Sequence, residues 1–291
     1  MNTIRLSSCD HPIDLRRAAQ VERFLHALSD NVEVAAVLQE SSRDPNAYVG
    51  RLVDSLFRQE ADAAVCPAAF LSAGVPQGIE VAAVHREGEP SYICVAVGEP
   101  DLRALEPGAK VAAWDAVSRA QLSFLHPDLS IAPIHSWSDL FEDLRHGAWS
   151  AACLPPYALA AGNTWGLRTS PIDPDHLLPA IGQSEIALLS LAGYAHRLVA
   201  SLNDPATERR LRFECAFWRC AMEIPDSVAT ASASLNGDMV SVTGLIAGTD
   251  GTWLVRDEGE AAVKFGEFVA EDVAESCKRA VPARWSHRAA S

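Results

Sequence analysis

The sequence carries little positive charge for its length. Lys and Arg together number 24 against 38 Asp and Glu, so the net charge is −14 at neutral pH. Neutralisation of phosphates supplies most of the affinity of general nucleic-acid and anionic-membrane binders, so this balance argues against both classes. We therefore expect neither a nucleic acid nor a membrane as partner, although a local basic pocket is compatible with the total.

Long apolar runs and paired cysteines are also lacking. No stretch reaches about 18 consecutive apolar residues, which argues against a transmembrane helix. Residues 1–15 lack a basic segment followed by an apolar core, so we expect no secretory signal. The seven cysteines are widely spaced and include no CxxC pair, which argues against a disulfide framework or a zinc ribbon. Reduced thiols in a cytoplasmic protein fit this usage best.

Common catalytic signatures are missing as well. The chain contains no P-loop, GxGxxG, HExxH or GxSxG motif. His135 and His146 have no cysteine or carboxylate at metal-ligand spacing, so we interpret them as solvated or hydrogen-bonded histidines and expect no metal.

What the sequence does contain is an alternation of strand-like and helix-like segments. The hydrophobic patterns predict strands at 3–8, 31–38 and 61–66, with helices at 15–28 and 48–59. The pattern restarts with strands at 110–113, 129–134 and 149–154, and with helices at 117–125 and 137–145. This order is typical of α/β layers with parallel strands. Two such halves usually face each other across a cleft, where strand ends and helix N-termini bind ligands.

The last third of the sequence differs in character. Residues 198–214 predict an arginine-rich helix, and residues 228–255 hold three alternating runs. Asn236-Gly237 and Asp250-Gly251 separate these runs, and both pairs are strong hairpin signals. A helix is predicted from Gly259 to Arg279, so this end reads as a small α+β domain.

Five segments carry a resemblance to one family. Residues 61–65 read ADAAV, residues 75–79 read VPQGI and residues 178–183 read LPAIGQ. Residues 102–129 include Pro107-Gly108, Gln121-Leu122 and Pro127-Asp128-Leu129, and a later segment holds Leu202-Asn203, Thr207 and Glu214. In the same order along the chain, these segments resemble conserved segments of the porphobilinogen deaminase (hydroxymethylbilane synthase) family. The resemblance covers roughly the whole chain.

The resemblance implies the fold and an activity. The implied fold class is α/β, with two type II periplasmic-binding-protein-like domains around a cleft and a small α+β C-terminal domain. The implied boundaries are 1–100 with 186–207 for domain 1, 101–185 for domain 2 and 208–291 for domain 3. Family members join four porphobilinogen units with release of ammonia to give hydroxymethylbilane. They prime this reaction with a dipyrromethane cofactor, which a thioether attaches to a cysteine of domain 3.

The sequence departs from the family where that chemistry is performed. Polymerisation of carboxylate-bearing pyrroles calls for arginine forks and for a carboxylate that stabilises the cationic azafulvene. Phe70 stands at the position of the family aspartate, and Ser8-Cys9 stands at that of a Thr-Arg pair. Residues 113–119 replace two arginines, although Arg119 lies one place away, and residues 133–141 lack two more.

The replaced positions define a candidate ligand-binding cleft. Its candidate residues are Ser8, Cys9, His11, Cys66, Phe70, Trp114, Asp115, Ser118, Arg119, His135 and Ser136. These residues, with the aromatic Trp137, suit a smaller and less anionic ligand than a growing pyrrole chain. Alternatively, the aromatic side chains fill the space left by the lost arginines.

Cys220 is a weak candidate for cofactor attachment. It lies near the place of the family cysteine, but the Gly-Gly pair before that cysteine is missing. We expect no cofactor, and dipyrromethane only if Cys220 is a displaced attachment site. Three functions stay open: a diverged member that binds or converts a different small molecule in the interdomain cleft, an active deaminase with displaced catalytic residues, and a non-catalytic pseudoenzyme partner.

Overall fold

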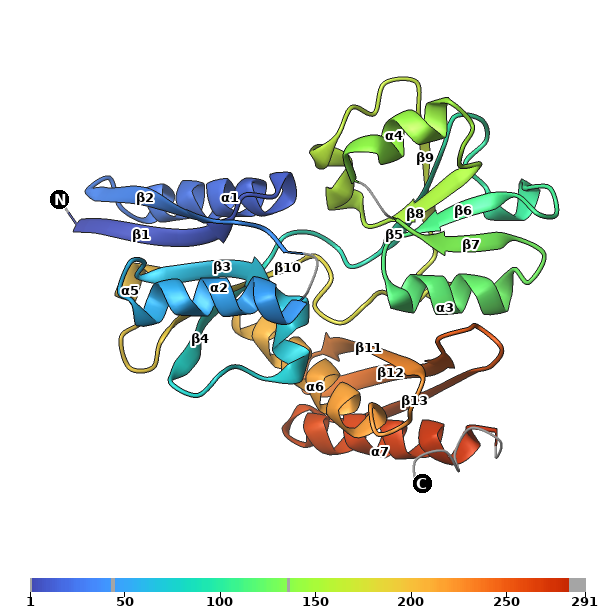
Figure 1. Ribbon diagram of the computed structural model, residues 1–291. Coiled ribbons are helices and arrows are strands. Elements are labelled where there is room, and N and C mark those ends of the chain that lie inside the picture. The colour runs from blue at the N-terminus through green and yellow to red at the C-terminus, as the bar shows by residue number, and fades with distance from the viewer. Residues whose placement is uncertain (1, 43–44, 135–136, 283–291) are drawn as a thin grey trace. The chain divides into compact units, whose positions relative to one another are not determined.

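The computed structural model describes residues 2–42, 45–134 and 137–282 (Figure 1). The chain forms two compact units, and each is described by itself. The first comprises residues 1–89 and 184–209, and the second comprises residues 90–183 and 210–291.

The first unit is built on a five-stranded mixed sheet in the order β2-β1-β3-β10-β4. Strand β1 runs parallel to β2 and β3, whereas β10 runs antiparallel to β3 and β4. The elements are β1 (Asn2–Cys9), α1 (Pro12–Leu28), β2 (Val32–Gln39), α2 (Pro45–Phe57), β3 (Ala63–Pro67), the 3-10 turn η1 (Ala68–Ala73), β4 (Ile79–Arg86), β10 (Glu185–Leu191) and α5 (Arg197–Ala200).

Helix α1 shows how the sequence specifies this unit. His11 caps the helix by accepting a hydrogen bond from the Ile13 amide. Pro12 occupies the first turn, where the backbone N–H that proline lacks would have no partner within the helix. Val21 and Leu25 lie on one face of α1 and pack with Ile4 of β1 in the core.

The second unit contains another five-stranded sheet, in the order β7-β6-β8-β5-β9. Here β6 runs parallel to β7 and β8, and β5 runs antiparallel to β8 and β9. The elements are β5 (Tyr92–Ala96), η2 (Leu102–Ala104), β6 (Lys110–Ala113), α3 (Ala116–Leu125), β7 (Ser130–Pro133), α4 (Trp137–Arg145), β8 (Ala151–Leu154), η3 (Pro156–Ala161) and β9 (Arg168–Ile172).

The two sheets share one topology. In each sheet, the first strand of a strand–helix–strand unit lies second from one edge, between its successor at that edge and the third strand at the centre. A single antiparallel strand from a distant part of the sequence then pairs with the third strand: β10 in one sheet and β5 in the other. This is the arrangement of two type II periplasmic-binding-protein-like domains, and the predicted fold class is confirmed.

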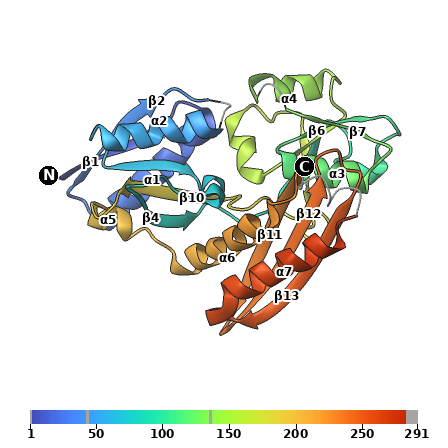
Figure 2. The same ribbon diagram turned by 60° about the horizontal axis from the view of Figure 1, so that its bottom comes forward.

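The small C-terminal domain belongs to the second unit. Helix α6 (Pro205–Ala221) enters it at Arg210, and its other elements are β11 (Ser227–Asn236), β12 (Met239–Gly248), β13 (Leu254–Ala262), η4 (Val263–Phe265) and α7 (Gly266–Ala280). The strands form an antiparallel meander, along which α7 lies (Figure 2).

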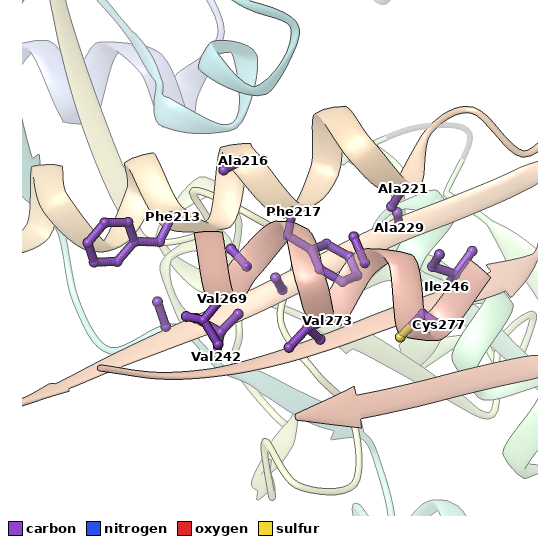
Figure 3. Close-up of a cluster of buried hydrophobic side chains, with 14 of the residues drawn as sticks. Phe213, Ala216, Phe217, Ala221, Ala229, Val242, Ile246, Val269, Val273 and Cys277 are labelled. Atoms are coloured by element: carbon purple, nitrogen blue, oxygen red, sulfur yellow. The ribbon is translucent and has the colours of Figure 1, made fainter. Parts of the chain in front are cut away.

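The core of this domain forms between its helices and its sheet. Phe217 of α6, Ile246 of β12 and Val273 of α7 pack in one buried cluster (Figure 3). Gly244 is required here because a Cβ atom at this position would lie 2.0 Å from the Phe217 ring.

Hydrogen bonds and apolar contacts join the C-terminal domain to the domain of the second sheet. The Thr230 hydroxyl donates a 2.6 Å hydrogen bond to the carbonyl of Pro179. Arg256 donates to the carbonyl of Asp175, 2.5 Å away. Ala120 and Leu245 also share a small apolar cluster.

Three details differ from the sequence predictions. The predicted helix at 198–214 is two helices, α5 and α6, because Pro205 starts a new helix rather than continuing the first. The last helix begins at Gly266, not at Gly259, because Gly259 pairs with Val242 inside β13. The sequence patterns do not predict strands β4, β5, β9 and β10. Strand β5 lies in the second sheet, and the predicted domain boundaries stay predictions.

Candidate functional site

The first group of candidate residues lies where the strands of the first sheet end. Strands β1, β3 and β4 run in the same direction, so their carboxyl ends share one edge of the sheet. Ser8 and Cys9 end β1, and Cys66 lies near the end of β3. All three side chains are buried, whereas His11 is half-buried at the start of α1.

The two cysteines at this edge are protonated thiols at neutral pH. Burial raises the pKa of Cys9 to about 11, with a smaller contribution from the Asp14 carboxylate. Burial raises the pKa of Cys66 to about 12, because desolvation outweighs the nearby Arg17. Neither thiol is thereby activated as a nucleophile.

Phe70 contributes a ring instead of a charge to the same edge. It lies on η1, directly after β3, and stacks on Tyr48 of α2 with ring centroids 4.9 Å apart and an interplanar angle of 22°. Phe70 is half-buried and Tyr48 is buried. Phe70, which the sequence analysis predicts to stand at the position of the family aspartate, is therefore one half of an aromatic pair.

A buried ionic network lies behind this pair. Arg17 Nε donates a 3.0 Å hydrogen bond to Glu87 Oε2, and Arg17 Nη1 lies 3.6 Å from Asp14 Oδ1. The side chains of all three residues are less than one-tenth exposed. Burial raises the pKa of Asp14, and Arg17 opposes that shift. The Arg17 guanidinium is thus engaged by the chain's own carboxylates.

The second group of candidate residues lies at the end of β6. Asp115 caps α3: its Oδ1 accepts a 2.6 Å hydrogen bond from the Ser118 amide, and the Ser118 hydroxyl completes the capping box. Asp115 Oδ2 accepts a 2.8 Å hydrogen bond from the Tyr92 hydroxyl. Burial raises the pKa of Asp115, and the hydrogen bonds from Ser118 and Tyr92 oppose this shift.

Aromatic rings meet at this second edge too. Trp114 directly follows β6, and its ring meets that of Tyr157 edge to face, with centroids 5.7 Å apart at 87°. Tyr157 lies on η3, which follows β8 as η1 follows β3. The third strand of each sheet is therefore followed by a 3-10 turn whose aromatic ring contacts a second aromatic ring.

Arg119 supplies an available positive charge in the first turn of α3. Its side chain is half-buried, and it forms no ion pair with any of the residues that the structure describes. A guanidinium in this state can accept a carboxylate-bearing ligand.

Cys220 lies in the C-terminal domain, on α6 and against α7. Its Sγ donates a 3.3 Å hydrogen bond to Glu275 Oε1, and Lys278 Nζ lies 3.9 Å from Sγ. Burial and the hydrogen bond to Glu275 raise the pKa of Cys220 to about 11, although Lys278 opposes this shift. A protonated, hydrogen-bonded thiol is a poor group for thioether formation.

Three further candidates have no described side chain. His135 and Ser136 lie outside the described residues, and the side chain of Trp137 is not described. Their contribution to a site stays a prediction.

Sequence reasoning missed the tyrosines. Tyr48, Tyr92 and Tyr157 are three of the four tyrosines in the chain, and each contacts a candidate residue. The place of Tyr157 shortly after the predicted strand at 149–154 could have served as a signal. The contacts of the three tyrosines could not be predicted, because each tyrosine lies on an element distant in sequence from its partner.

The segments that carry the family resemblance have structural contacts. The Gln121 amide accepts from the Leu178 amide and donates to its carbonyl, both at 2.9 Å. Asn203 Oδ1 accepts a 2.8 Å hydrogen bond from the Val84 amide, and Glu214 Oε1 accepts one of 3.0 Å from Ala233. These polar side chains satisfy buried backbone groups, which explains how such residues hold the fold.

Comparison with known proteins decides the family. Residues 15–196, more than half of the chain, match the family described as "Porphobilinogen deaminase, dipyromethane cofactor binding domain". The chain belongs to the porphobilinogen deaminase family. A porphobilinogen deaminase of Rubrobacter xylanophilus is 31% identical over 277 residues, which are 89% of this chain and 90% of the relative. One from Thermus thermophilus is 27% identical over 80% of this chain and 79% of its own.

Membership of the porphobilinogen deaminase family places the chain among proteins of tetrapyrrole biosynthesis and confirms the predicted resemblance. Among solved structures, the VFT2 domain of Bordetella pertussis BvgS is similar with a TM-score of 0.45 and 18% identity, over 71% of this chain and 87% of that one. A LysR-family regulator from Pseudomonas aeruginosa gives a TM-score of 0.46 and 15% identity, over 72% and 71% of the two chains.

Among the described residues, every helix is too short or too polar to span a membrane. Within the same residues, no cluster of three or more His, Cys, Asp or Glu side chains could hold a metal ion.

Proposed function

We propose that this chain is a porphobilinogen deaminase family member that binds a planar, carboxylate-bearing small molecule and does not polymerise porphobilinogen by the family's primer-dependent reaction. The observation that carries the proposal is the stack of Phe70 on Tyr48 at the position aligned with the family aspartate. An aromatic pair offers a flat apolar surface, and it supplies no negative charge to a developing azafulvene cation.

The second edge supports the same ligand class. Trp114 and Tyr157 present another pair of half-buried rings, and Arg119 nearby is available for a carboxylate. Asp115 already accepts hydrogen bonds from Ser118 and Tyr92, so it is engaged in shaping the edge. We expect the ligand to be a small molecule with one flat conjugated ring system.

The proposal includes the absence of a dipyrromethane primer. Cys220 is protonated at neutral pH, and its Sγ faces Glu275 and Lys278 of α7. These neighbours do not fit a thioether to a group that carries several carboxylates, because Lys278, the cation beside Sγ, is already paired with Glu223 and Glu275. A cytoplasmic location is part of the same proposal, supported by the unpaired state of all seven cysteines.

A second candidate function is favoured by the family itself. An active deaminase with displaced catalytic residues would fit the identity to named porphobilinogen deaminases over most of the chain. It would use Arg119 in place of an arginine that the sequence lacks. The two candidates differ in whether porphobilinogen is consumed with formation of hydroxymethylbilane.

Binding measurements with matched variants test the proposal. Porphobilinogen and indole-3-acetate serve as probes in calorimetric titrations of the wild type, Phe70→Ala, Trp114→Ala and Arg119→Gln. We expect at least one probe to bind without turnover. The variants of the edge that holds the probe, either Phe70→Ala in the first unit or Trp114→Ala and Arg119→Gln in the second, should weaken its binding about tenfold, the loss expected for one aromatic or charge-assisted contact. Trp165→Ala and Phe268→Ala are controls, because both rings are largely exposed elsewhere. Equal binding by wild type and all three variants, or turnover of porphobilinogen, would contradict the proposal.

A further inference from the structure

Cys94 and Cys153 face each other across two neighbouring strands of the second sheet. Strands β5 and β8 are antiparallel, and Cys94 is the direct register partner of Cys153. Directly opposed residues of an antiparallel pair project to the same face. Both side chains accordingly lie in one buried cluster.

The backbone identifies the kind of pair. The Cys153 carbonyl accepts a 3.1 Å hydrogen bond from the Trp114 amide, which lies directly beyond β6. The amide and carbonyl of one strand residue point to the same side, so those of Cys153 face β6 and not β5. Cys94 and Cys153 therefore form a non-hydrogen-bonded pair, in which Cα atoms are about 4.5 Å apart and side chains are closest.

This spacing is suited to a covalent bond. Disulfides join residues whose Cα atoms are about 4.4–6.8 Å apart, and the non-hydrogen-bonded pair falls within that range. We propose that Cys94 and Cys153 are a redox pair that closes to a cross-strand disulfide when a low-molecular-weight disulfide oxidises it. This modification site is independent of the proposed ligand binding.

The two thiols differ in access. Cys94 lies on the wall of a cavity of about 520 Å³, which Arg103, His126 and His176 also line. Cys153 is fully buried and does not line this cavity. An incoming reagent therefore meets Cys94 first, and the cavity provides space for the bulky mixed disulfide.

The reaction proceeds by two exchange steps that balance. The Cys94 thiolate attacks one sulfur of the reagent, forms a mixed disulfide and releases one reagent thiol, which takes up the Cys94 proton. The Cys153 sulfur then attacks Cys94 Sγ, and the second reagent thiol leaves with the Cys153 proton. The protein loses two hydrogen atoms and the reagent disulfide becomes two thiols.

The environment sets the rate of this exchange. Burial raises the pKa of Cys94 to about 12, and Asp101 adds to the shift. Burial also raises the pKa of Cys153 well above its ordinary value. Only a small fraction of either thiol is ionised at neutral pH, so the reaction is slow there and accelerates as the pH rises.

The pair adjoins the candidate site in the second unit. Tyr92 lies two residues from Cys94 on the same face of β5, and its hydroxyl donates to Asp115. Closure of the disulfide fixes β5 to β8 directly beside this contact. We expect the oxidised protein to unfold at a higher temperature than the reduced one, because the crosslink restricts the unfolded chain.

Trapping the intermediate tests the proposal. Proteins in a Cys220→Ser background, which removes the most exposed thiol, are incubated with oxidised glutathione at pH 8.5, alkylated, and analysed by intact mass and peptide mapping. We expect the parent to lose two alkylatable thiols and to yield a peptide pair joined through Cys94 and Cys153. Cys153→Ser should instead accumulate one glutathione on Cys94, whereas Cys94→Ser should form neither product.

Alanine variants show whether the results of the serine variants arise from misfolding. Cys94→Ala and Cys153→Ala should give the same two patterns, with circular dichroism showing that each variant is folded. The proposal is overturned if the folded parent keeps both thiols alkylatable, if the disulfide joins another pair, or if glutathione attaches to Cys153 as readily as to Cys94.

Discussion

The Tyr92 hydroxyl donates a 2.8 Å hydrogen bond to Asp115 Oδ2, joining β5 to the first turn of α3. Both side chains are at the carboxyl end of β6, and Asp115 also caps the helix through Ser118. One carboxylate thus fixes the start of α3, the position of Trp114 before it and a strand from elsewhere in the sequence. The candidate site in the second unit depends on this carboxylate for its shape.

Tyr92→Phe tests this relationship. Loss of a hydrogen bond to a charged carboxylate costs about 1.5–3 kcal/mol, and loss of one to a neutral group costs about 0.5–1.5 kcal/mol. The variant should therefore lose more stability above the raised pKa of Asp115 than below it. Urea unfolding of wild type and variant between pH 4 and 8 measures this difference. A loss that is the same at every pH would show that Asp115 does not ionise in this range.

Asp115 sets a direction in which the stability of the wild type changes with pH. Burial raises the pKa of Asp115 in the folded chain above its unfolded value, so protonation favours the folded state. This contribution is fully present below the ordinary aspartate pKa and is lost as the pH rises through the raised pKa. Asp115→Asn should remove that slope in urea unfolding, while an unchanged slope would assign it to other groups.

Arg17 should be required for the stability of the first unit. Arg17→Met leaves Glu87 and Asp14 buried without their cation, and removing one member of a buried pair costs about 3–5 kcal/mol. Thermal unfolding measures the loss. Arg23→Met is the matched control, because Arg23 is exposed on the same helix and its replacement should cost less than about 0.5 kcal/mol. Equal effects of the two variants would show that the network does not stabilise the fold.

Gln121 should be needed for the segment that begins at Leu178. Gln121→Ala removes the partner of both backbone groups of Leu178, each of which costs about 1–3 kcal/mol when left buried and unpaired. Gln121→Glu keeps the acceptor and loses the donor, so its loss should be intermediate. Urea unfolding of the three proteins gives the order, and equal stability of Gln121→Ala and wild type would refute it.

Gly244→Ala should disrupt the core of the C-terminal domain. The added Cβ would lie 2.0 Å from the fully buried Phe217 ring, so the ring or the strand must move. Overpacking of this kind costs about 1–3 kcal/mol or more. Gly88→Ala has open space at its Cβ and serves as the control in the same thermal-unfolding measurement. If Gly244→Ala and Gly88→Ala unfold at the same temperature, the close packing of the buried cluster in Figure 3 does not determine the stability of the domain.

Much of the α/β organisation could be predicted from periodicity. The segments from β1 to β3 and from β6 to β8 alternate clearly between strand and helix patterns. Strand β10, in contrast, is buried on both faces, so its apolar residues follow no alternation. The sequence pattern does not indicate that strand β5 belongs to the second sheet, because β5 pairs with β8 and β9, which follow much later in the sequence.

The candidate site was predictable only where its residues are neighbours in sequence. Trp114, Asp115 and Ser118 lie together because one helix start holds them. Their partners Tyr92 and Tyr157 come from other strands and turns, so no local pattern indicates the contacts. That Phe70 stands at the position of the family aspartate stays a prediction from the sequence, and no local pattern indicates its stacking on Tyr48.

We propose that the chain carries no covalent primer and does not polymerise porphobilinogen. The most direct test is the denatured intact mass of the protein, purified from cells that produce porphobilinogen, beside that of Cys220→Ser. We expect the wild type to have the mass of its sequence and the two proteins to differ only by the substitution. An added mass of one dipyrromethane on the wild type, lost in Cys220→Ser, would overturn the proposal and identify an active deaminase.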